Sequence, residues 1–266
     1  NKGQLGINNS NRMGDDTGEM ALLTSIDLGT GRTATAIAAG EYHSCALLDN
    51  ASVKCWGKND WGQLGIDSTL AMGNSSGEMA LLTGINLGTG RTAIAIAAGD
   101  YNTCALLDNA SVKCWGSNGD GESGIDNATD DDMGNSSGEM ALLPVVKLGT
   151  GRTATAISIG NDHICAVLDD ASVKCWGSND WGQLGIDNTN SMGDNSSEMA
   201  LLTGINLGTG RTATAIAAGN SFTCAVLDDA SVKCWGRNSS GQLGIDNNTT
   251  MGDNSSEMAV LPSINF

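Results

Sequence analysis

The chain has 266 residues, of which 40% are hydrophobic, so it is long enough to bury a sizeable core. Its formal net charge of −17 argues against nucleic acids or anionic membranes as partners, because like charges repel. No apolar run approaches the roughly 20 residues of a membrane-spanning helix, so we expect no membrane insertion.

One block of sequence occurs four times along the chain: G-R-T-A-x-A-I-x-x-G-x-x-x-x-C-A-x-L-D-x-A-S-V-K-C-W-G. The copies end at Gly57, Gly116, Gly177 and Gly236, which gives a period of 59 to 61 residues. Such a period is typical of one supersecondary unit that is copied and stacked, so we expect a single tandem array. Its repeats are 1–57, 58–116, 117–177 and 178–236, with a partial repeat at 237–266.

Each repeat contains four strand-like runs separated by turn signals. In the second repeat these runs span 79–87, 92–98, 103–107 and 111–115. The 37 glycines, the 4% aromatic content and the lack of sustained helical periodicity also favour short strands and tight turns. Four antiparallel strands are the composition of a β-propeller blade. We therefore predict an all-β protein built of four to five propeller-type blades.

All eight cysteines fall into four pairs of equal spacing, each flanking the turn signal Asp-Asn-Ala-Ser or Asp-Asp-Ala-Ser. The pattern predicts a β-hairpin in which Cys45 lies opposite Cys55 and Leu47 lies opposite Val53, so that a disulfide is feasible. Reduced or metal-bound thiols are the alternative, although zinc sites favour Cys-x-x-Cys pairs or histidines, of which this chain has two. The predicted disulfides are Cys45–Cys55, Cys104–Cys114, Cys165–Cys175 and Cys224–Cys234.

Four disulfides indicate an oxidising compartment, which we expect to be extracellular or at the cell surface. Acceptor sequences for N-glycosylation agree with that compartment, and most of them lie in polar, loop-like stretches. The alternative explanation is compositional, because Asn, Ser and Thr are common in turns and copying multiplies any sequon. The candidate glycosylation sites are Asn8, Asn50, Asn74, Asn109, Asn127, Asn135, Asn195, Asn238, Asn247, Asn248 and Asn254.

The succession A-I-A-A-G-x-x-H-x-C-A-L…V-K-C-W-G-x-N-x-x-G-Q-L-G at 36–65 resembles the regulator of chromosome condensation repeat. The resemblance covers essentially all of the chain and implies the blades of a seven-bladed β-propeller. It implies little about function, because the family includes a nuclear exchange factor, a plant photoreceptor and secreted inhibitors of β-lactamase. The family's histidine position holds His43 and His163, which we interpret as structural. The cysteine pairs depart from the family pattern and argue against a nuclear role.

The two halves of the repeat occur in unequal numbers. The half that runs from Gly-Gln-Leu-Gly to Met-Ala occurs five times, and the half from Gly-Arg-Thr to Cys-Trp-Gly occurs four times. A closed ring of seven blades cannot be made from this set. We expect either a segment of a larger propeller or blades that neighbouring chains complete, and the second arrangement is an open contact of the kind that builds fibres.

Tryptophan occupies two kinds of position. One kind recurs in every repeat and predicts core or inter-blade packing. These residues are Trp56, Trp115, Trp176 and Trp235. Trp61 and Trp181 instead occupy a slot that varies between repeats, so they are candidate partner-binding residues on exposed loops, with simple loop packing as the alternative.

The charged residues give weaker signals. The recurring arginines, such as Arg32, are expected to pair with the recurring glutamates, such as Glu19. Clustered carboxylates at 15–16 and 130–132 are candidate calcium ligands, but neither fits an EF-hand, and we predict no other metal or cofactor. A hydrolase would need a carboxylate or histidine cluster peculiar to one repeat, and the only candidates are Asp120 and Glu122 with 130–132. No catalytic motif is recognisable, so we predict that the chain is not an enzyme.

Our leading functional hypothesis is an extracellular structural or adhesive repeat glycoprotein, as a building block of a surface fibre or appendage that self-associates. The alternative is a secreted module that binds a protein or a carbohydrate through propeller loops, including Trp61 and Trp181. Regularly spaced sequons, disulfides confined to single repeats and unmatched ends favour the first hypothesis.

Overall fold

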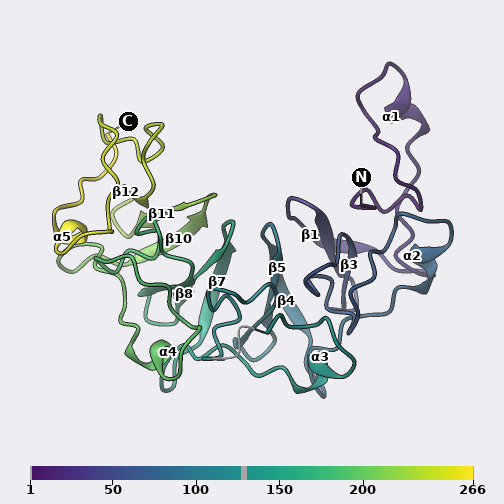
Figure 1. Cartoon of the computed structure of the whole chain (residues 1–266), viewed down its shortest axis with the longest axis horizontal. Helices are drawn as coiled ribbons and strands as arrows, with labels where there is room; N and C mark the ends of the chain where they lie inside the picture. Colours follow the sequence, from purple (N-terminus) through teal and green to yellow (C-terminus); the bar gives the residue numbers. More distant parts are fainter. Residues whose placement is uncertain (1, 127–130, 266) are drawn as a thin grey trace. The chain divides into compact units, whose positions relative to one another are not determined.

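The computed structural model describes residues 2–126 and 131–265, and it divides into two compact units (Figure 1). The first unit comprises Asn1–Asp108, Trp115–Ser117 and Asp132–Leu143. The second comprises Asn109–Cys114, Asn118–Asp131 and Pro144–Phe266. Among the described residues no helix is long and apolar enough to cross a membrane.

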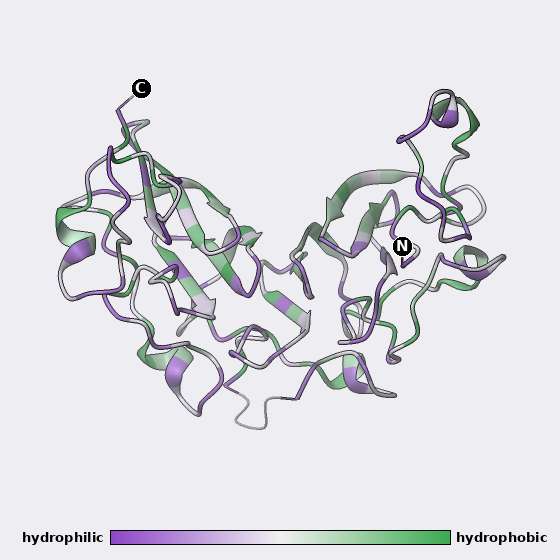
Figure 2. Cartoon of the chain, turned by 45° about the horizontal axis from the view of Figure 1, so that its top comes forward, coloured by the Kyte–Doolittle hydropathy of each residue, from purple (hydrophilic) through white to green (hydrophobic). Residues whose placement is uncertain are grey.

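Each repeat forms one antiparallel sheet of three strands in sequence order, so the predicted all-β class is confirmed. The strands are β1 (Ala34–Ala39), β2 (His43–Leu48), β3 (Val53–Gly57), β4 (Ala93–Ala98), β5 (Asn102–Leu107), β6 (Val112–Gly116), β7 (Ala154–Ile159), β8 (His163–Leu168), β9 (Val173–Gly177), β10 (Ala213–Ala218), β11 (Phe222–Leu227) and β12 (Val232–Gly236). Figure 2 shows hydrophobic stretches along the strands, with hydrophilic stretches mainly in the connecting loops.

The prediction of a fourth strand was wrong. The run 79–87 begins in a one-turn helix and continues as extended chain outside any sheet. Glu78 explains the helix, because its Oε2 accepts hydrogen bonds from the backbone N–H groups of Asn74 (2.9 Å) and Ser75 (2.8 Å) and fixes a turn there. Among the described residues the helices are α1 (Glu19–Leu22), α2 (Glu78–Leu81), α3 (Glu139–Leu142), α4 (Glu198–Leu201) and α5 (Glu257–Val260).

The hairpins have the predicted register. Cys45 pairs with Cys55 and Leu47 pairs with Val53, and the two sulfurs are joined at 2.02 Å. Disulfides Cys165–Cys175 and Cys224–Cys234 follow the same pattern. Cys104 and Cys114 are also disulfide-bonded, and no cysteine in the described part of the chain is free. The reduced-thiol and metal-thiolate alternatives are therefore set aside.

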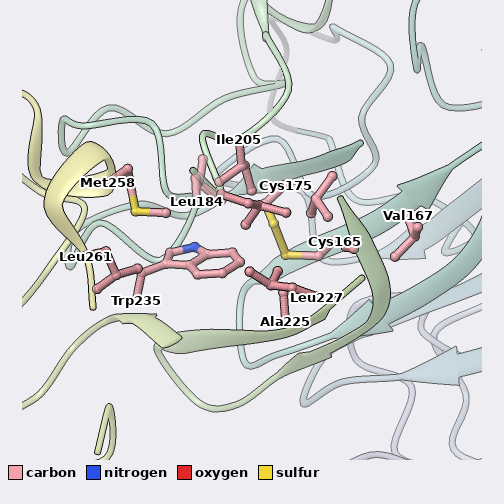
Figure 3. Close-up of a cluster of buried hydrophobic side chains, with 13 residues drawn as sticks. Cys165, Val167, Cys175, Leu184, Ile205, Ala225, Leu227, Trp235, Met258 and Leu261 are labelled. Carbon is pink, nitrogen blue, oxygen red and sulfur yellow. A yellow bond between two sulfur atoms is a disulfide. The ribbon is translucent and has the colours of Figure 1, made fainter. Parts of the chain in front are cut away.

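The recurring tryptophans form the core, as predicted. In the second compact unit Trp235 is fully buried among Leu184, Met258 and Leu261, beside the Cys165–Cys175 disulfide (Figure 3). Its indole N–H donates to the backbone oxygen of Gln183 at 3.0 Å.

The Gly-Gln-Leu-Gly turn is shaped around this tryptophan. Trp115 makes the equivalent bond to the Gln63 oxygen at 3.1 Å. Gly65 has a φ of +64°, and a Cβ there would lie 2.7 Å from the Trp115 Nε1. A residue with a side chain would therefore be strained and would clash, which explains why glycine recurs in this turn.

Candidate functional site

Trp61 belongs to an aromatic–lysine cluster in the first compact unit, made of Tyr42, Lys58, Trp61 and Tyr101. The two tyrosine rings are stacked, with centroids 6.0 Å apart and an interplanar angle of 25°. The Trp61 ring meets Tyr101 edge-on at 6.3 Å. Lys58 Nζ lies 5.2 Å from the centroid of each tyrosine ring, which is within the range of a cation–π interaction.

The loops that carry the cluster are held by buried hydrogen bonds. Lys58 N–H donates to the Tyr42 backbone oxygen at 2.9 Å, which joins the loop after β3 to the loop after β1. The buried Asn59 side chain accepts from the Leu64 N–H at 2.9 Å, and buried Gln63 accepts from the Trp61 N–H at 3.0 Å. The backbone is thereby fixed while the Trp61 side chain remains 42% exposed.

Carboxylates surround this cluster. Asp60 lies 3.4 Å from Lys58 Nζ. A hydrogen bond to Glu41 is the largest of the effects that raise the pKa of the Tyr42 hydroxyl to about 12. The arrangement offers aromatic faces, a phenol, an ammonium group and carboxylates within one small surface, and tryptophan and tyrosine are enriched at the energetic centres of protein interfaces.

Trp181 occupies the corresponding slot in the second compact unit, in a different setting. Trp181 is also 42% exposed, and the Arg237 guanidinium lies 4.9 Å from the centroid of its ring. The tyrosine slots hold Asp162 and Ser221 here. Burial, followed by the Asp120 charge, raises the pKa of the Asp162 carboxyl. The structure thus places both predicted tryptophans on exposed loops, and only Trp61 joins a stacked aromatic group.

Both histidines are buried, and each forms a hydrogen bond with a buried threonine. His43 Nε2 is hydrogen-bonded to Thr103 Oγ1 at 2.8 Å, and His163 makes the same contact with Thr223 at 2.9 Å. Burial lowers the pKa of each imidazole to about 4, so both are neutral at physiological pH.

The carboxylates peculiar to the third repeat also have structural contacts. Glu122 is 2% exposed and its Oε2 accepts from the Asp120 N–H at 3.0 Å, as Gln63 accepts from Trp61 in the second repeat. Burial raises the pKa of Glu122 to about 8. In the described ranges, 2–126 and 131–265, no group of three or more His, Cys, Asp or Glu residues is placed to hold a metal ion.

No described calcium candidate belongs to a group of three or more side chains that is placed to hold a metal ion. Asp130 lies outside the described residues. The backbone N–H groups of Asp15 and Asp16 donate to Glu19 Oε2 at 3.1 and 3.0 Å, so that this loop is organised around a carboxylate of its own.

The expected arginine–glutamate pairing was wrong. Arg32 Nη1 lies 3.4 Å from Asp49, and Arg91 Nη1 lies 3.3 Å from Asp108. The arginine precedes the first strand of its repeat and reaches the hairpin turn instead. The recurring glutamate is engaged elsewhere, because it accepts backbone N–H groups before each short helix, as Glu139 does from Asn135 (3.0 Å) and Ser136 (2.9 Å).

The candidate glycosylation sites differ in accessibility. Asn238 is fully buried, and its Nδ2 donates to the backbone oxygens of Asn247 (2.8 Å) and Thr249 (2.9 Å), so this amide has no room for a glycan and the assignment is corrected. Asn127 lies outside the described residues. Asn8 is half-buried, and its Oδ1 accepts from the Met79 N–H. Exposed candidates are Asn50, Asn109, Asn195, Asn247, Asn248 and Asn254, and half-buried ones are Asn74 and Asn135.

Comparison with known proteins identifies the repeat. The family model described as "Regulator of chromosome condensation (RCC1) repeat" matches residues 34–63, 93–122, 154–183 and 213–242. Human "Probable E3 ubiquitin-protein ligase HERC4" is 27% identical over 209 residues, which cover 78% of this chain and 18% of HERC4. The Arabidopsis thaliana "Ultraviolet-B receptor UVR8" is 29% identical over 214 residues, which cover 80% of this chain and 43% of UVR8.

Solved structures agree on the fold. Human WBSCR16 superposes with a TM-score of 0.66 at 20% identity, over 88% of this chain and 52% of that chain. Yeast RCC1 (Prp20), solved bound to Kap60, superposes with a TM-score of 0.61 at 23% identity, over 81% of this chain and 47% of that chain. The chain spans less than two thirds of each of these proteins. The chain thus contains four copies of a repeat that matches the RCC1 repeat model, and the solved structures support a propeller-like fold.

Proposed function

We propose that this chain is a non-enzymatic binding module that holds a protein partner through its aromatic–lysine cluster. The observation that carries the proposal is the Trp61 side chain, which is half-exposed on a loop whose backbone is fixed by buried Asn59 and Gln63. Aromatic anchors on rigid backbones lose little entropy on binding and recur as energetic centres of interfaces. Lys58 and Asp60 beside it supply polar groups for orientation.

Binding by a relative supports a protein rather than a sugar as partner. The solved structures of yeast Prp20 describe it bound to Kap60 and describe its binding to Gsp1p and histones. The HERC4 match covers 18% of that ligase, so ligase activity does not come with it. Carbohydrate binding is retained as an outcome of the experiment, because tryptophan and tyrosine faces also stack on sugars.

The test is a binding screen followed by a matched pair of variants. Native chain is screened against purified extracellular proteins and, separately, against a glycan array. Each ligand found is measured again with Trp61→Ala and with Leu70→Ala, which removes another exposed side chain of the first compact unit. We expect Trp61→Ala to weaken a protein ligand by about tenfold or more and Leu70→Ala to leave it unchanged. Equal affinities in both variants, or glycan ligands alone, would contradict the proposal.

We further propose that the module works in an oxidising, extracellular or cell-surface compartment and is N-glycosylated. Disulfides within single hairpins support the compartment. The exposed hairpin-tip residues Asn50 and Asn109 are the favoured glycan carriers. Mass spectrometry of native material should find no alkylatable thiol and should find glycan at the tips but none at buried Asn238. Reduced thiols in native material would remove the basis for this localisation.

A structural or adhesive role, as a building block of a surface fibre, is the second candidate function. It is favoured by one observation, the direct stacking of repeats, in which Ile85 N–H donates to the Val53 oxygen of the preceding repeat and Ile205 N–H donates to the Val173 oxygen. Electron microscopy of native, unreduced material tests the role. Filaments with a regular repeat would support it, and isolated particles at all concentrations would count against it.

A further inference from the structure

The chain already places an arginine on one of its two exposed tryptophans. The Arg237 guanidinium lies 4.9 Å from the centroid of the Trp181 ring, within the range of a cation–π interaction. Arg237 Nε donates to Ser239 Oγ at 3.0 Å, and the Arg237 backbone N–H donates to the Ser221 backbone oxygen at 2.9 Å. These two bonds fix the arginine beside the ring. A tryptophan in this slot of the repeat can therefore hold a guanidinium.

Trp61 occupies the same slot two repeats earlier, but it has no such arginine. The position that corresponds to Arg237 is Ser117, and both residues directly follow the Cys-Trp-Gly end of a repeat. The backbone contact is the same, because the Ser117 N–H donates to the Tyr101 oxygen at 3.1 Å. Serine carries no charge, and among the described residues no guanidinium or ammonium group lies over the Trp61 ring. Trp61 is nevertheless as exposed as Trp181, at 42%.

The surroundings of this open tryptophan have an excess of negative charge. Glu41 is hydrogen-bonded to Tyr42, and the charge of Asp100 also acts on Tyr42. Asp60 lies 3.4 Å from Lys58 Nζ. Three carboxylates thus accompany one ammonium group, in a chain whose net charge is −17. A cationic ligand is attracted by this excess, whereas an anionic ligand is repelled.

The chemistry of the slot favours arginine over lysine as that cation. A guanidinium is planar, stacks on aromatic faces and carries N–H groups that pair with carboxylates. An ammonium group is a compact, strongly hydrated point charge. The chain shows the same distinction, because Arg237 lies over Trp181, whereas Lys58 lies beside tyrosine rings and pairs with Asp60.

We propose that the partner bound by the aromatic–lysine cluster presents an arginine side chain, which lies over Trp61 as Arg237 lies over Trp181. This inference rests on the proposed function and specifies the chemistry of its partner, an arginine-rich protein segment. The guanidinium covers the exposed ring, and the neighbouring carboxylates attract its charge. One exposed tryptophan is thus occupied by an arginine of the chain itself, and the equivalent one is offered to an arginine of the partner.

The first experiment compares two synthetic peptides that differ only in their cation. Both alternate glycine and serine with the cationic residue, which is arginine in one peptide and lysine in the other. Binding to the native chain is measured by isothermal titration calorimetry at about 150 mM sodium chloride, which screens the long-range attraction of the acidic chain equally for both. We expect the arginine peptide to bind roughly fivefold more tightly or better.

Two truncations test whether this preference depends on the proposed ring. Trp61→Ala should remove the preference, so that both peptides bind with equal and weaker affinity. Leu70→Ala is the control, because Leu70 is 70% exposed in the same compact unit and lies outside the aromatic–lysine cluster. It should keep the preference of the native chain.

Ser117→Arg tests the contact by supplying an arginine from the chain itself. The backbone of this residue is already held by Tyr101, so the new side chain starts from the position that Arg237 has beside Trp181. We expect the arginine peptide to bind about fivefold more weakly or worse. Ser76→Arg adds the same charge on an exposed loop of the same compact unit and should bind the peptide nearly as the native chain does.

Arg237→Ser is the reciprocal variant, because it uncovers Trp181. The arginine peptide should then quench more tryptophan fluorescence than it quenches in the native chain. Adding Trp181→Ala to Arg237→Ser should abolish this increase. The lysine peptide should produce a smaller increase at the same concentration.

Either of two results would overturn the inference. One is equal affinity of the native chain for the arginine and lysine peptides, and the other is an arginine preference that survives Trp61→Ala. A protein ligand that depends on Trp61 but is not displaced by the arginine peptide would also overturn it, while leaving the proposed binding module intact. Protein ligands that Trp61→Ala leaves unchanged would instead contradict the proposed function itself, so the two failures are distinguishable.

Discussion

Glu122 shows how one residue changes the properties of a repeated framework without changing its shape. It occupies the position of Gln63 and Gln183, and its Oε2 accepts the same type of backbone N–H. A glutamine there is neutral at every pH, whereas a buried glutamate must give up hydration to ionise. Burial accordingly raises the pKa of Glu122 from 4.5 to about 8.

Replacing Glu122 by Gln should therefore stabilise the protein in a pH-dependent way. The folded-state pKa lies above the unfolded value, so the stabilising contribution of the protonated carboxyl is present below pH 4.5 and is lost as pH rises through about 8. Glu122→Gln should nearly match the native chain near pH 4.5 and exceed its free energy of unfolding by on the order of 3–4 kcal/mol at pH 7–8. Urea unfolding across this pH range measures the difference.

The reverse substitution is the control. Gln63→Glu, at the same position in the first compact unit, should lose stability with the same dependence on pH. If both variants follow the native profile, the carboxyl of Glu122 is not buried as described.

The buried histidines should make the folded protein less stable at acidic pH. Burial lowers the folded-state pKa of His43 and His163 from 6.5 to about 4, so stability should fall as pH falls from 6.5 toward 4. His43→Asn introduces the residue that the second repeat has at Asn102 and should make this fall shallower. Thermal unfolding at pH 4.5 and 6.5 compares the slopes. Adding His163→Asn should flatten the fall further, and an unchanged slope would contradict neutral buried imidazoles.

Sequence variation identified Trp61 and Trp181 as exposed, but it did not identify the residues around them. Tyr42, Lys58 and Tyr101 come from three different loops, so no local pattern joins them. One signal was available. Tyr42 and Tyr101 occupy the same slot in consecutive repeats, and stacked repeats bring equal slots side by side. A comparison of equivalent positions would have found the pair, if it had searched for a residue type that two neighbouring repeats share and the other repeats lack.

Each disulfide should stabilise its own hairpin. Cys45 and Cys55 are separated by 10 residues and pair directly across β2 and β3. The double variant Cys45→Ala/Cys55→Ala should lose about 2–3 kcal/mol of unfolding free energy on the chain-entropy model. Urea unfolding of oxidised protein measures this loss. Cys165→Ala/Cys175→Ala, with equal separation in the second compact unit, should lose a similar amount, and a negligible loss in both would show that the hairpin is held by packing alone.

The hairpin was predictable from the sequence and the fourth strand was not, for the same physical reason. Cys45 and Cys55 are close in the sequence, and turn chemistry and side-chain alternation fix the register of the short hairpin between them. The run 79–87 has strand-like composition, but its conformation is set by the Glu78 carboxylate on the N–H groups of Asn74 and Ser75. A side chain that accepts backbone donors outweighs a weak strand propensity.

The stacking of repeats explains why equivalent residues of different repeats are buried to different extents. Leu23 and Leu82 have equivalent neighbours in the chain but different exposure, because a repeat buries its face only against the repeat before it. The sequence predicts such faces without predicting their occupants. The fold of a repeat therefore follows from its own sequence, whereas the exposure of its face depends on what packs against it.

The net charge of −17 should make the thermal stability of the protein depend on the salt concentration. Many carboxylates repel one another across the folded protein, and added salt screens exposed charges over about 10 Å at 0.1 M. Raising sodium chloride from about 10 mM to about 500 mM should increase the thermal unfolding temperature, and choline chloride should act equally at the same ionic strength because screening does not depend on the cation. Calcium chloride at matched ionic strength separates screening from binding. An extra stabilisation by calcium alone would reveal a specific site, whereas equal effects of all three salts would assign the whole stabilisation to the charge of the molecule.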